Sequence, residues 1–231
     1  MTLLSSTDYL DAVLVLHQSL CDVRSKYPLL VVVTNTVFTP KIEEIFISKN
    51  ILYEVVDPMF YSKITTQRDK GKTVLNTASK IQIFFLYQWD KLVYIDADTL
   101  VIDNIDNLFQ YPDGSMIYYD KADWGFSGLF VFSPRNHKES DYFETIMQYC
   151  DCYDGDLLGK IWFYVKQNPN YQIPGCYLQP YFANRTLPID TRVIHYANEK
   201  KPWLLPNDEF FSVKYEGARL YKETLEKIKY N

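Results

Sequence analysis

Apolar residues in the first hundred positions follow two alternating patterns. Short continuous runs are typical of buried strands, and segments with apolar residues three or four positions apart are typical of helices. The runs cover residues 2–4, 29–34, 51–56 and 92–95. The segments with helical spacing cover residues 9–23, 41–49 and 73–89. Because the two patterns alternate along the chain, we predict parallel strands and a doubly wound α/β sheet.

The pattern changes after residue 101, where turn-forming residues become frequent. Further strands are predicted over residues 115–119, 128–132 and 191–196, and further helices over residues 138–149 and 219–230. No internal repeat or linker interrupts the chain. We predict one domain over residues 1–231, with a Rossmann-like nucleotide-binding half over 1–101, a mixed central sheet, and a smaller acceptor-side half over 102–231.

The composition is that of an ordinary globular protein, with 47% hydrophobic and 23% charged residues among 231. The net charge of −5 argues against nonspecific binding to nucleic acids, which requires a basic surface. No apolar run approaches the ~20 residues of a membrane span. The first residues also lack the basic and apolar regions of a signal peptide. We therefore expect a cytoplasmic protein without a membrane span.

Two acidic residues, Asp96 and Asp98, directly follow the apolar run at 92–95. Carboxylates are costly to bury unless a cation meets them, so we expect both at the carboxyl end of a strand, facing a ligand. Oxygen donors on a short tether suit a hard divalent cation such as Mg²⁺ or Mn²⁺. The alternative is an Asp-rich turn after a strand, because the motif is short and common.

His195 ends a short apolar strand, and Lys201, Pro202 and Trp203 follow it closely. One interpretation is a hydrogen-bonded core histidine. The other is a third ligand for a cation held by the two aspartates, with Lys201 supplying a point charge to a phosphate on the same cation. Lys80 stands between apolar positions of the predicted helix at 73–89, so it is either a solvated helix residue or part of the same site.

A set of stretches in fixed order narrows these alternatives. They are Thr2-Leu3 with Asp8-Tyr9, residues 13–16 (VLVL) with 18–20 (QSL), residues 94–101 (YIDADTLV), residues 104–109 (NIDNLF), residues 126–132 (FSGLFVF), Asp154-Gly155, and His195 with Lys201-Pro202-Trp203. Asp-x-Asp alone is a weak signal, whereas this order with a later His-x5-Lys-Pro-Trp is specific. On these residues the chain resembles glycosyltransferase family 8, the glycogenin-like group, along nearly its whole length.

The resemblance implies a GT-A fold and metal-dependent transfer of glucose or galactose from a UDP-sugar, with retention of anomeric configuration and with Mn²⁺ or Mg²⁺ as cofactor. It places the metal on Asp96, Asp98 and His195. It implies contacts with the nucleotide-sugar, apart from those of the two aspartates, by Leu3, Ser5, Ser6, Tyr9, Lys80, Ala97, Asn198 and Lys201. It assigns the transfer chemistry and the donor sugar to Lys80, Asp120, Asp123 and Asp156. Because no carboxylate stands out as a nucleophile, the implied mechanism is a same-face displacement assisted by the diphosphate.

The acceptor side departs from the family pattern at Leu157-Leu158, where an acidic residue and a glutamine are usual. Asp154 or Asp156 would have to substitute, or transfer is weakened. The acceptor is therefore open: a sugar, a protein, a lipid or the chain itself. Members of this group often form homodimers, and that also stays open. Two other functions remain as alternatives, a UDP- and metal-binding protein that has lost transfer and a metal-dependent phosphohydrolase.

Overall fold

The computed structural model describes residues 1–58, 79–119, 124–137, 167–181, 186–197, 201–203 and 216–230. The predicted helix at 138–149 lies outside these residues. None of the helices among the described residues has the length and apolar character needed to cross a membrane.

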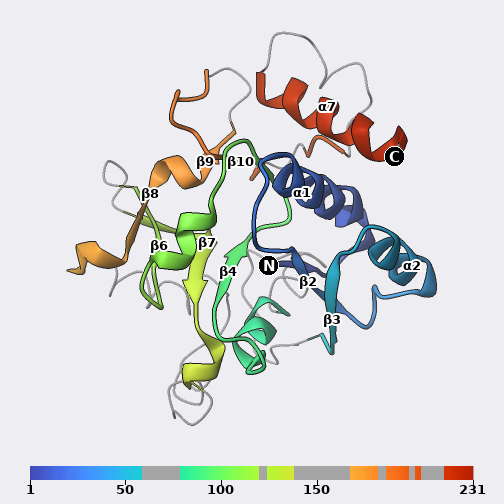
Figure 1. The fold of residues 1–231 in the computed structure, drawn as a ribbon, viewed down its shortest axis with the longest axis horizontal. Helices are drawn as coiled ribbons and strands as arrows, with labels where there is room; N and C mark the ends of the chain where they lie inside the picture. Colours follow the sequence, from blue (N-terminus) through green and yellow to red (C-terminus); the bar gives the residue numbers. More distant parts are fainter. Residues whose placement is uncertain are drawn as a thin grey trace, which may run out of the picture.

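The first sheet is parallel, as the alternating pattern predicts. Its strand order is β1 (Thr2–Leu4), β2 (Leu30–Thr34) and β3 (Leu52–Val56), with helices α1 (Leu10–Asp22) and α2 (Pro40–Ser48) in the connections (Figure 1). Every residue of β2 is buried. Val31 and Val33 pack into one apolar cluster and Leu30 and Val32 into another, which explains why the run is apolar on both faces.

The second sheet is mixed and continues the first. Its order is β4 (Leu92–Ile95), β7 (Trp124–Phe132), β6 (Met116–Tyr119) and β8 (Gln172–Pro174). Neighbouring strands are antiparallel except for β6 and β8. The main chain of Met1 joins the sheets, because its nitrogen donates to the Val93 carbonyl at 2.6 Å and its carbonyl accepts from the Ile95 amide at 2.9 Å. The central sheet is therefore mixed, as predicted, with β4 beside β1.

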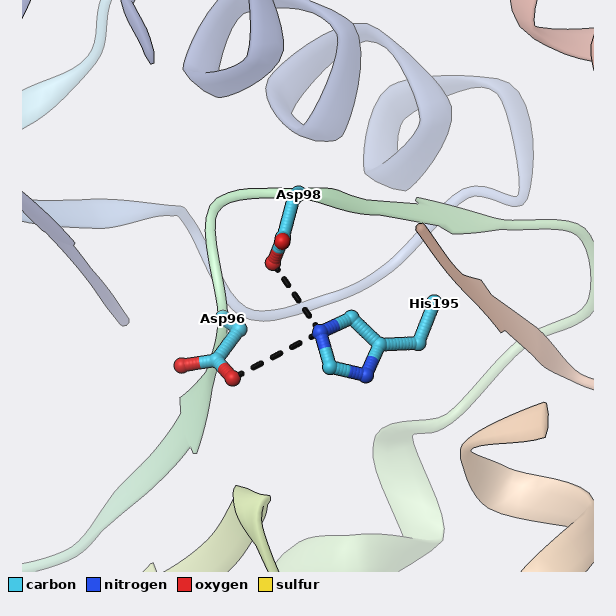
Figure 2. Close-up of side chains that lie close together, drawn as sticks. All are labelled: Asp96, Asp98 and His195. Carbon is cyan, nitrogen blue, oxygen red and sulfur yellow. Dashed lines mark hydrogen bonds and ion pairs between the residues drawn. The ribbon is translucent and has the colours of Figure 1, made fainter. Parts of the chain in front are cut away.

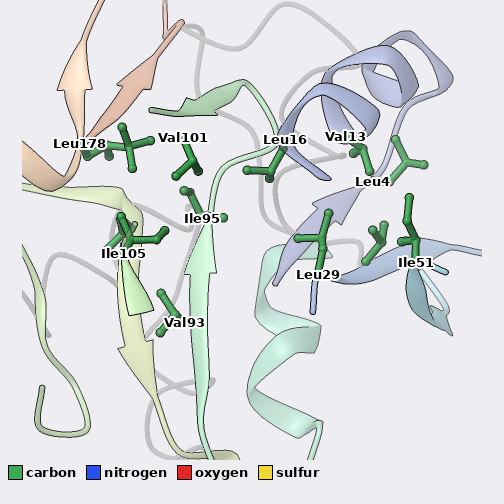
Figure 3. Packing of buried hydrophobic residues seen from close by; sticks show 14 of the residues in the cluster. Leu4, Val13, Leu16, Leu29, Ile51, Val93, Ile95, Val101, Ile105 and Leu178 are labelled. Carbon is green, nitrogen blue, oxygen red and sulfur yellow. The ribbon is translucent and has the colours of Figure 1, made fainter. Parts of the chain in front are cut away.

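A third, small sheet brings the second half of the chain back to β4. Strand β10 (Val193–His195) lies between β5 (Thr99–Val101), to which it is antiparallel, and β9 (Gln179–Pro180), to which it is parallel. The main apolar cluster fills the space between these strands, the central sheet and α1 (Figure 3). The site residues that follow β4 are thus held on packed strands.

Two helical segments differ from the prediction. Within 73–89, the described part forms a short 3₁₀ helix, Ser79–Phe85, in place of a continuous α-helix. The last helix, α7 (Glu216–Tyr230), begins earlier than predicted and is not polar all round. Its residues Ala218, Tyr221 and Thr224 are buried, and α7 lies beside α1 (Figure 1). The other 3₁₀ helices within the described residues are Thr7–Tyr9, Asp106–Gln110, Pro134–His137, Pro169–Tyr171 and Gly175–Tyr177.

Candidate active site

The turn from Asp96 to Asp98 connects β4 to β5 and is fixed at both ends. The Asp96 amide donates to the Gly128 carbonyl of β7 at 2.9 Å. The Thr99 hydroxyl donates back to the Asp96 carbonyl at 2.7 Å. Because the turn cannot rotate freely, the two carboxylates leave the end of β4 in defined directions.

His195 reaches the same place through main-chain pairing. In the antiparallel register of β5 and β10, His195 stands opposite Thr99. The next amide along, that of Tyr196, donates to the Asp98 carbonyl at 2.9 Å. Sheet pairing therefore places an imidazole beside an aspartate 97 residues earlier in the sequence.

The three side chains converge on one small volume (Figure 2). The Nε2 atom of His195 lies 3.0 Å from Oδ1 of Asp98 and 3.6 Å from Oδ2 of Asp96. Asp98 and His195 are buried, and Asp96 is half-buried. The predicted metal ligands are thus brought together by the fold, and each presents one donor atom to the others.

Two lysines hold the remaining carboxylate oxygens. The ammonium of Lys80 lies 3.0 Å from Oδ1 of Asp96. The ammonium of Lys201 lies 2.5 Å from Oδ2 of Asp98 and also donates to the Tyr196 carbonyl at 2.8 Å. Both lysines are buried, so neither pair is a screened surface interaction. Two carboxylates and two ammonium groups leave the site near neutrality.

This environment controls the ionisation of Asp98. Burial alone would raise the pKa of its carboxyl group, but His195 and Lys201 outweigh burial and hold that pKa well below its usual range. Burial, together with the charges of Asp98 and Asp96, raises the pKa of nearby Tyr9 to about 12. Asp98 is therefore ionised at neutral pH, as a metal ligand must be.

The donor set fits a divalent cation. The three ligand atoms lie within 4.8 Å of one another. Adjacent donors on an octahedral cation with bonds of about 2.1 Å lie roughly 3 Å apart, close to the separations found here. Carboxylate oxygens with an imidazole nitrogen suit Mn²⁺ and related first-row cations. Because the lysines hold the outer oxygens, the inner ones stay directed at the common centre.

The site also stands where a nucleotide would be expected in an open α/β sheet. Strand β1 has β2 on one side and β4 on the other, so the direction of strand progression reverses between β1 and β4. Ligands of such sheets bind beyond the carboxyl ends of the strands at this reversal. Asp96 follows β4, and Ser5 and Ser6 follow β1.

Comparisons with known proteins agree with this location. No protein-family model matches the chain. Galactinol synthase 3 from Arabidopsis thaliana is 34% identical over 115 residues, which are 49% of this chain and 34% of that protein. Glycogenin-1 from Caenorhabditis elegans is 30% identical over 149 residues, which cover 55% of this chain and 32% of that protein. The matches thus span about a third of the length of these relatives.

The chain is thus similar in sequence to galactinol synthases and to glycogenin. Solved structures confirm the predicted GT-A fold. The galactosyltransferase LgtC, in complex with donor and acceptor sugar analogues, superposes with a TM-score of 0.67 over 98% of this chain and 95% of that chain, at 15% identity. The glycosyltransferase GlyE from Streptococcus pneumoniae gives a TM-score of 0.61 over 97% of this chain and 60% of that chain, at 14% identity.

The other predicted site residues fall into two groups. Tyr9 packs edge-on against Trp203, with ring centroids 5.3 Å apart, and its ring lies 5.9 Å from the Lys201 ammonium. Leu3 is half-buried in β1, Ser5 and Ser6 follow that strand, and Ala97 is buried between the aspartates. The remaining predicted residues, Asp120, Asp123, Asp156 and Asn198, lie outside the described residues, as does the Leu157-Leu158 pair.

Tyr94 and Tyr221 also belong to the surroundings of the site, although neither is among the predicted site residues. The hydroxyl of Tyr94 donates to Oδ1 of Asp96 at 2.9 Å. The contact of Tyr94 could have been predicted, since residues two apart on a strand share a face and Tyr94 stands two residues before Asp96. Tyr221 of α7 stacks on Trp203 with ring centroids 5.8 Å apart. Because Trp203 precedes α7 and is not part of it, no helical or strand periodicity points to that contact.

Proposed function

We propose that this protein is a metal-dependent hexosyltransferase that uses a UDP-sugar as donor. The observation that carries the proposal is the convergence of Asp96, Asp98 and His195 at the strand reversal, next to two buried lysines. The relatives named galactinol synthase and glycogenin, and the fold shared with LgtC, support a sugar transfer over other chemistry at such a site.

The proposed roles follow from the chemistry of the leaving group. Cleavage of a glycosyl–phosphate bond leaves a diphosphate with growing negative charge. A divalent cation held by the two aspartates and His195 would act as a Lewis acid on that diphosphate. Lys201 would turn from Asp98 to the phosphate oxygens and supply fixed positive charge where negative charge develops, and Lys80, held at Asp96, would add its charge nearby. Tyr9, between Trp203 and Lys201, would flank the nucleotide.

The finer assignments are part of the same proposal. We expect Mn²⁺ as the metal, UDP-glucose or UDP-galactose as the donor, and retention of configuration by same-face displacement. Asp120, Asp123 and Asp156 remain the candidates for contacts with the donor sugar and acceptor. The acceptor itself, whether sugar, protein, lipid or the chain, the homodimer and the cytoplasmic location also stay predictions. The phosphohydrolase alternative is not favoured, because the relatives and structural neighbours are glycosyltransferases.

The proposal is tested with purified protein, Mn²⁺ and each UDP-hexose, by measuring UDP release and the intact mass of the protein. We expect metal-dependent UDP release that Asp98→Asn reduces by at least 100-fold, because a cation stabilising the leaving group contributes several kcal/mol. Asp103→Asn is the matched control. Asp103 is exposed and pairs with Arg192 at 2.9 Å on the surface, so its loss should leave UDP release unchanged.

The same experiment separates the alternatives. Release of inorganic phosphate without UDP would indicate a phosphohydrolase. Binding of UDP and Mn²⁺ with no sugar released or transferred would indicate a protein that has lost transfer. Equal UDP release by wild type and Asp98→Asn would refute the metal-dependent mechanism. An increase in intact mass by one or more hexoses would identify the chain as its own acceptor.

A further inference from the structure

Tyr94 contacts the candidate metal site through Asp96. It lies on β4, two residues before Asp96, and its side chain is buried. Its ring stacks on Phe130 of β7, with centroids 4.9 Å apart and an interplanar angle of 21°. Its hydroxyl donates to Oδ1 of Asp96 at 2.9 Å. The ring is therefore fixed by the sheet, and the hydroxyl transmits that position to the carboxylate.

Lys80 completes the contact from a different element. Its ammonium lies 3.0 Å from the same Oδ1 atom and 4.5 Å from the centroid of the Tyr94 ring. The cation–π geometry holds the ammonium over the ring. The Lys80 ammonium and the Tyr94 hydroxyl then donate to the same oxygen of Asp96. The other oxygen of Asp96, Oδ2, is the one that faces His195 at 3.6 Å.

We propose that Tyr94 is a positioning residue that makes Asp96 offer a single oxygen to the cation. A carboxylate with one oxygen held by two donors cannot turn to present both oxygens. Partners of metal ligands act in this way, by fixing the orientation of the ligand. The inference rests on the metal-binding part of the proposed function but does not depend on sugar transfer.

This arrangement selects among cations. Small cations such as Mg²⁺ and Mn²⁺ require near-octahedral geometry, to which a carboxylate contributes one oxygen, whereas Ca²⁺ is larger and readily accepts both oxygens of one carboxylate. Holding Oδ1 away from the centre therefore favours Mn²⁺ over Ca²⁺. Releasing it should weaken Mn²⁺ binding and leave Ca²⁺ binding nearly unchanged.

Tyr94→Phe tests the inference, because it removes the hydroxyl and keeps the ring that stacks on Phe130 and lies under Lys80. The affinities for Mn²⁺ and Ca²⁺, each added alone, are measured by calorimetry, and thermal unfolding is recorded without metal. The matched control is Tyr53→Phe. The Tyr53 hydroxyl also donates to a carboxylate, Oε1 of Glu43 at 2.7 Å, but on β3, away from the site.

We expect Tyr94→Phe to bind Mn²⁺ about tenfold less tightly, with a smaller change for Ca²⁺. Tyr53→Phe should change neither affinity. In an Asp96→Asn background, Tyr94→Phe should have no further effect on Mn²⁺ affinity, since the hydroxyl acts through the carboxylate. Unchanged Mn²⁺ affinity, equal losses for both cations, or a Tyr94→Phe protein that does not fold would overturn the inference. Mn²⁺ selectivity in a protein without sugar transfer would refute the proposed function and leave this inference standing.

Discussion

Lys201 places a positive charge directly beside the candidate metal site, and replacing it should have opposite effects on metal binding and on nucleotide binding. Its ammonium lies 2.5 Å from Oδ2 of Asp98, and both side chains are buried. Methionine has a similar length but no charge. We predict that Lys201→Met binds Mn²⁺ alone more tightly than wild type, because the ammonium no longer repels the cation or neutralises Asp98. The same variant should bind UDP more weakly in the presence of Mn²⁺.

The magnitude follows from the geometry of the pair. Two unit charges 2.5 Å apart attract by about 7 kcal/mol at an effective dielectric constant of 20, before desolvation is subtracted. Removing one member of a buried pair costs about 3–5 kcal/mol in measured cases. Because Asp98 keeps His195 as a second partner at 3.0 Å, we expect the lower end, about 3 kcal/mol, for the metal-free protein.

Bound Mn²⁺ should return much of that loss by neutralising Asp98. If it recovers about 1.4 kcal/mol, thermodynamic linkage requires Mn²⁺ to bind the variant about tenfold more tightly. Loss of a charged hydrogen bond to the diphosphate, worth about 1.5–3 kcal/mol, should weaken UDP binding at least tenfold. The assays are urea unfolding with and without Mn²⁺, and calorimetry with Mn²⁺ alone and then with UDP.

The control is Lys91→Met, since the Lys91 ammonium donates to a carbonyl, that of Tyr111 at 2.7 Å, and to no site carboxylate among the contacts of the described residues. Its cost in unfolding free energy should be the same with and without Mn²⁺. The reasoning about Lys201 is refuted if Lys201→Met binds Mn²⁺ alone equally or more weakly, or if its stability loss is independent of the metal.

Three further predictions concern the scaffold. Thr39→Ala removes the side-chain oxygen that accepts from the Ile42 amide and so caps the start of α2. The free energy of urea unfolding should fall by about 1 kcal/mol, and an unchanged value would show that this cap does not stabilise the helix. Gly217→Ala places a Cβ atom 2.6 Å from Cε2 of Tyr181, so thermal unfolding should report a loss of about 1–3 kcal/mol despite the better helix propensity of alanine; a stabilised variant would show that the ring moves aside. Burial works to raise the pKa of Asp106, but hydrogen bonds, first from the Ser25 hydroxyl, lower it below its ordinary value. The stability that Asp106 contributes is therefore present at neutral pH and is lost as pH falls through the lowered pKa. Urea unfolding should show a deficit for Asp106→Asn at pH 7 that shrinks towards pH 3, and a constant deficit would argue against the charge.

The sequence was sufficient for the parts of the fold that local patterns encode. The run in β2 is apolar at successive positions because both its faces are covered, and the two aspartates follow β4 because the carboxyl end of that strand opens on a site. His195 and Lys201 were accessible through a motif of fixed spacing. In each case residues close together in the sequence are enough to predict the element or the site residue.

The sequence was not sufficient where distant packing decides. Apolar spacing in 73–89 predicted an α-helix, yet the part from Ser79 to Phe85 is 3₁₀-helical, and spacing of three residues suits both forms. There Phe84 packs edge-on against Phe132, with centroids 4.5 Å apart, a contact that no local pattern reveals. Helix α7 packs Ala218 and Tyr221, with Leu225 and Ile228, into a cluster that also contains Val15 of α1, a partner that no local pattern reveals.

The candidate metal site is set by strand register as much as by its ligands. Asp96 and Asp98 belong to one turn, but the third donor arrives only because β10 pairs with β5 with His195 opposite Thr99. A slip of one residue would turn the imidazole to the other face of the small sheet, since side chains alternate along a strand. The Tyr196 amide bound to the Asp98 carbonyl at 2.9 Å fixes that register beside the ligand itself. A cation bound by all three residues would therefore stabilise the long-range pairing of β5 and β10.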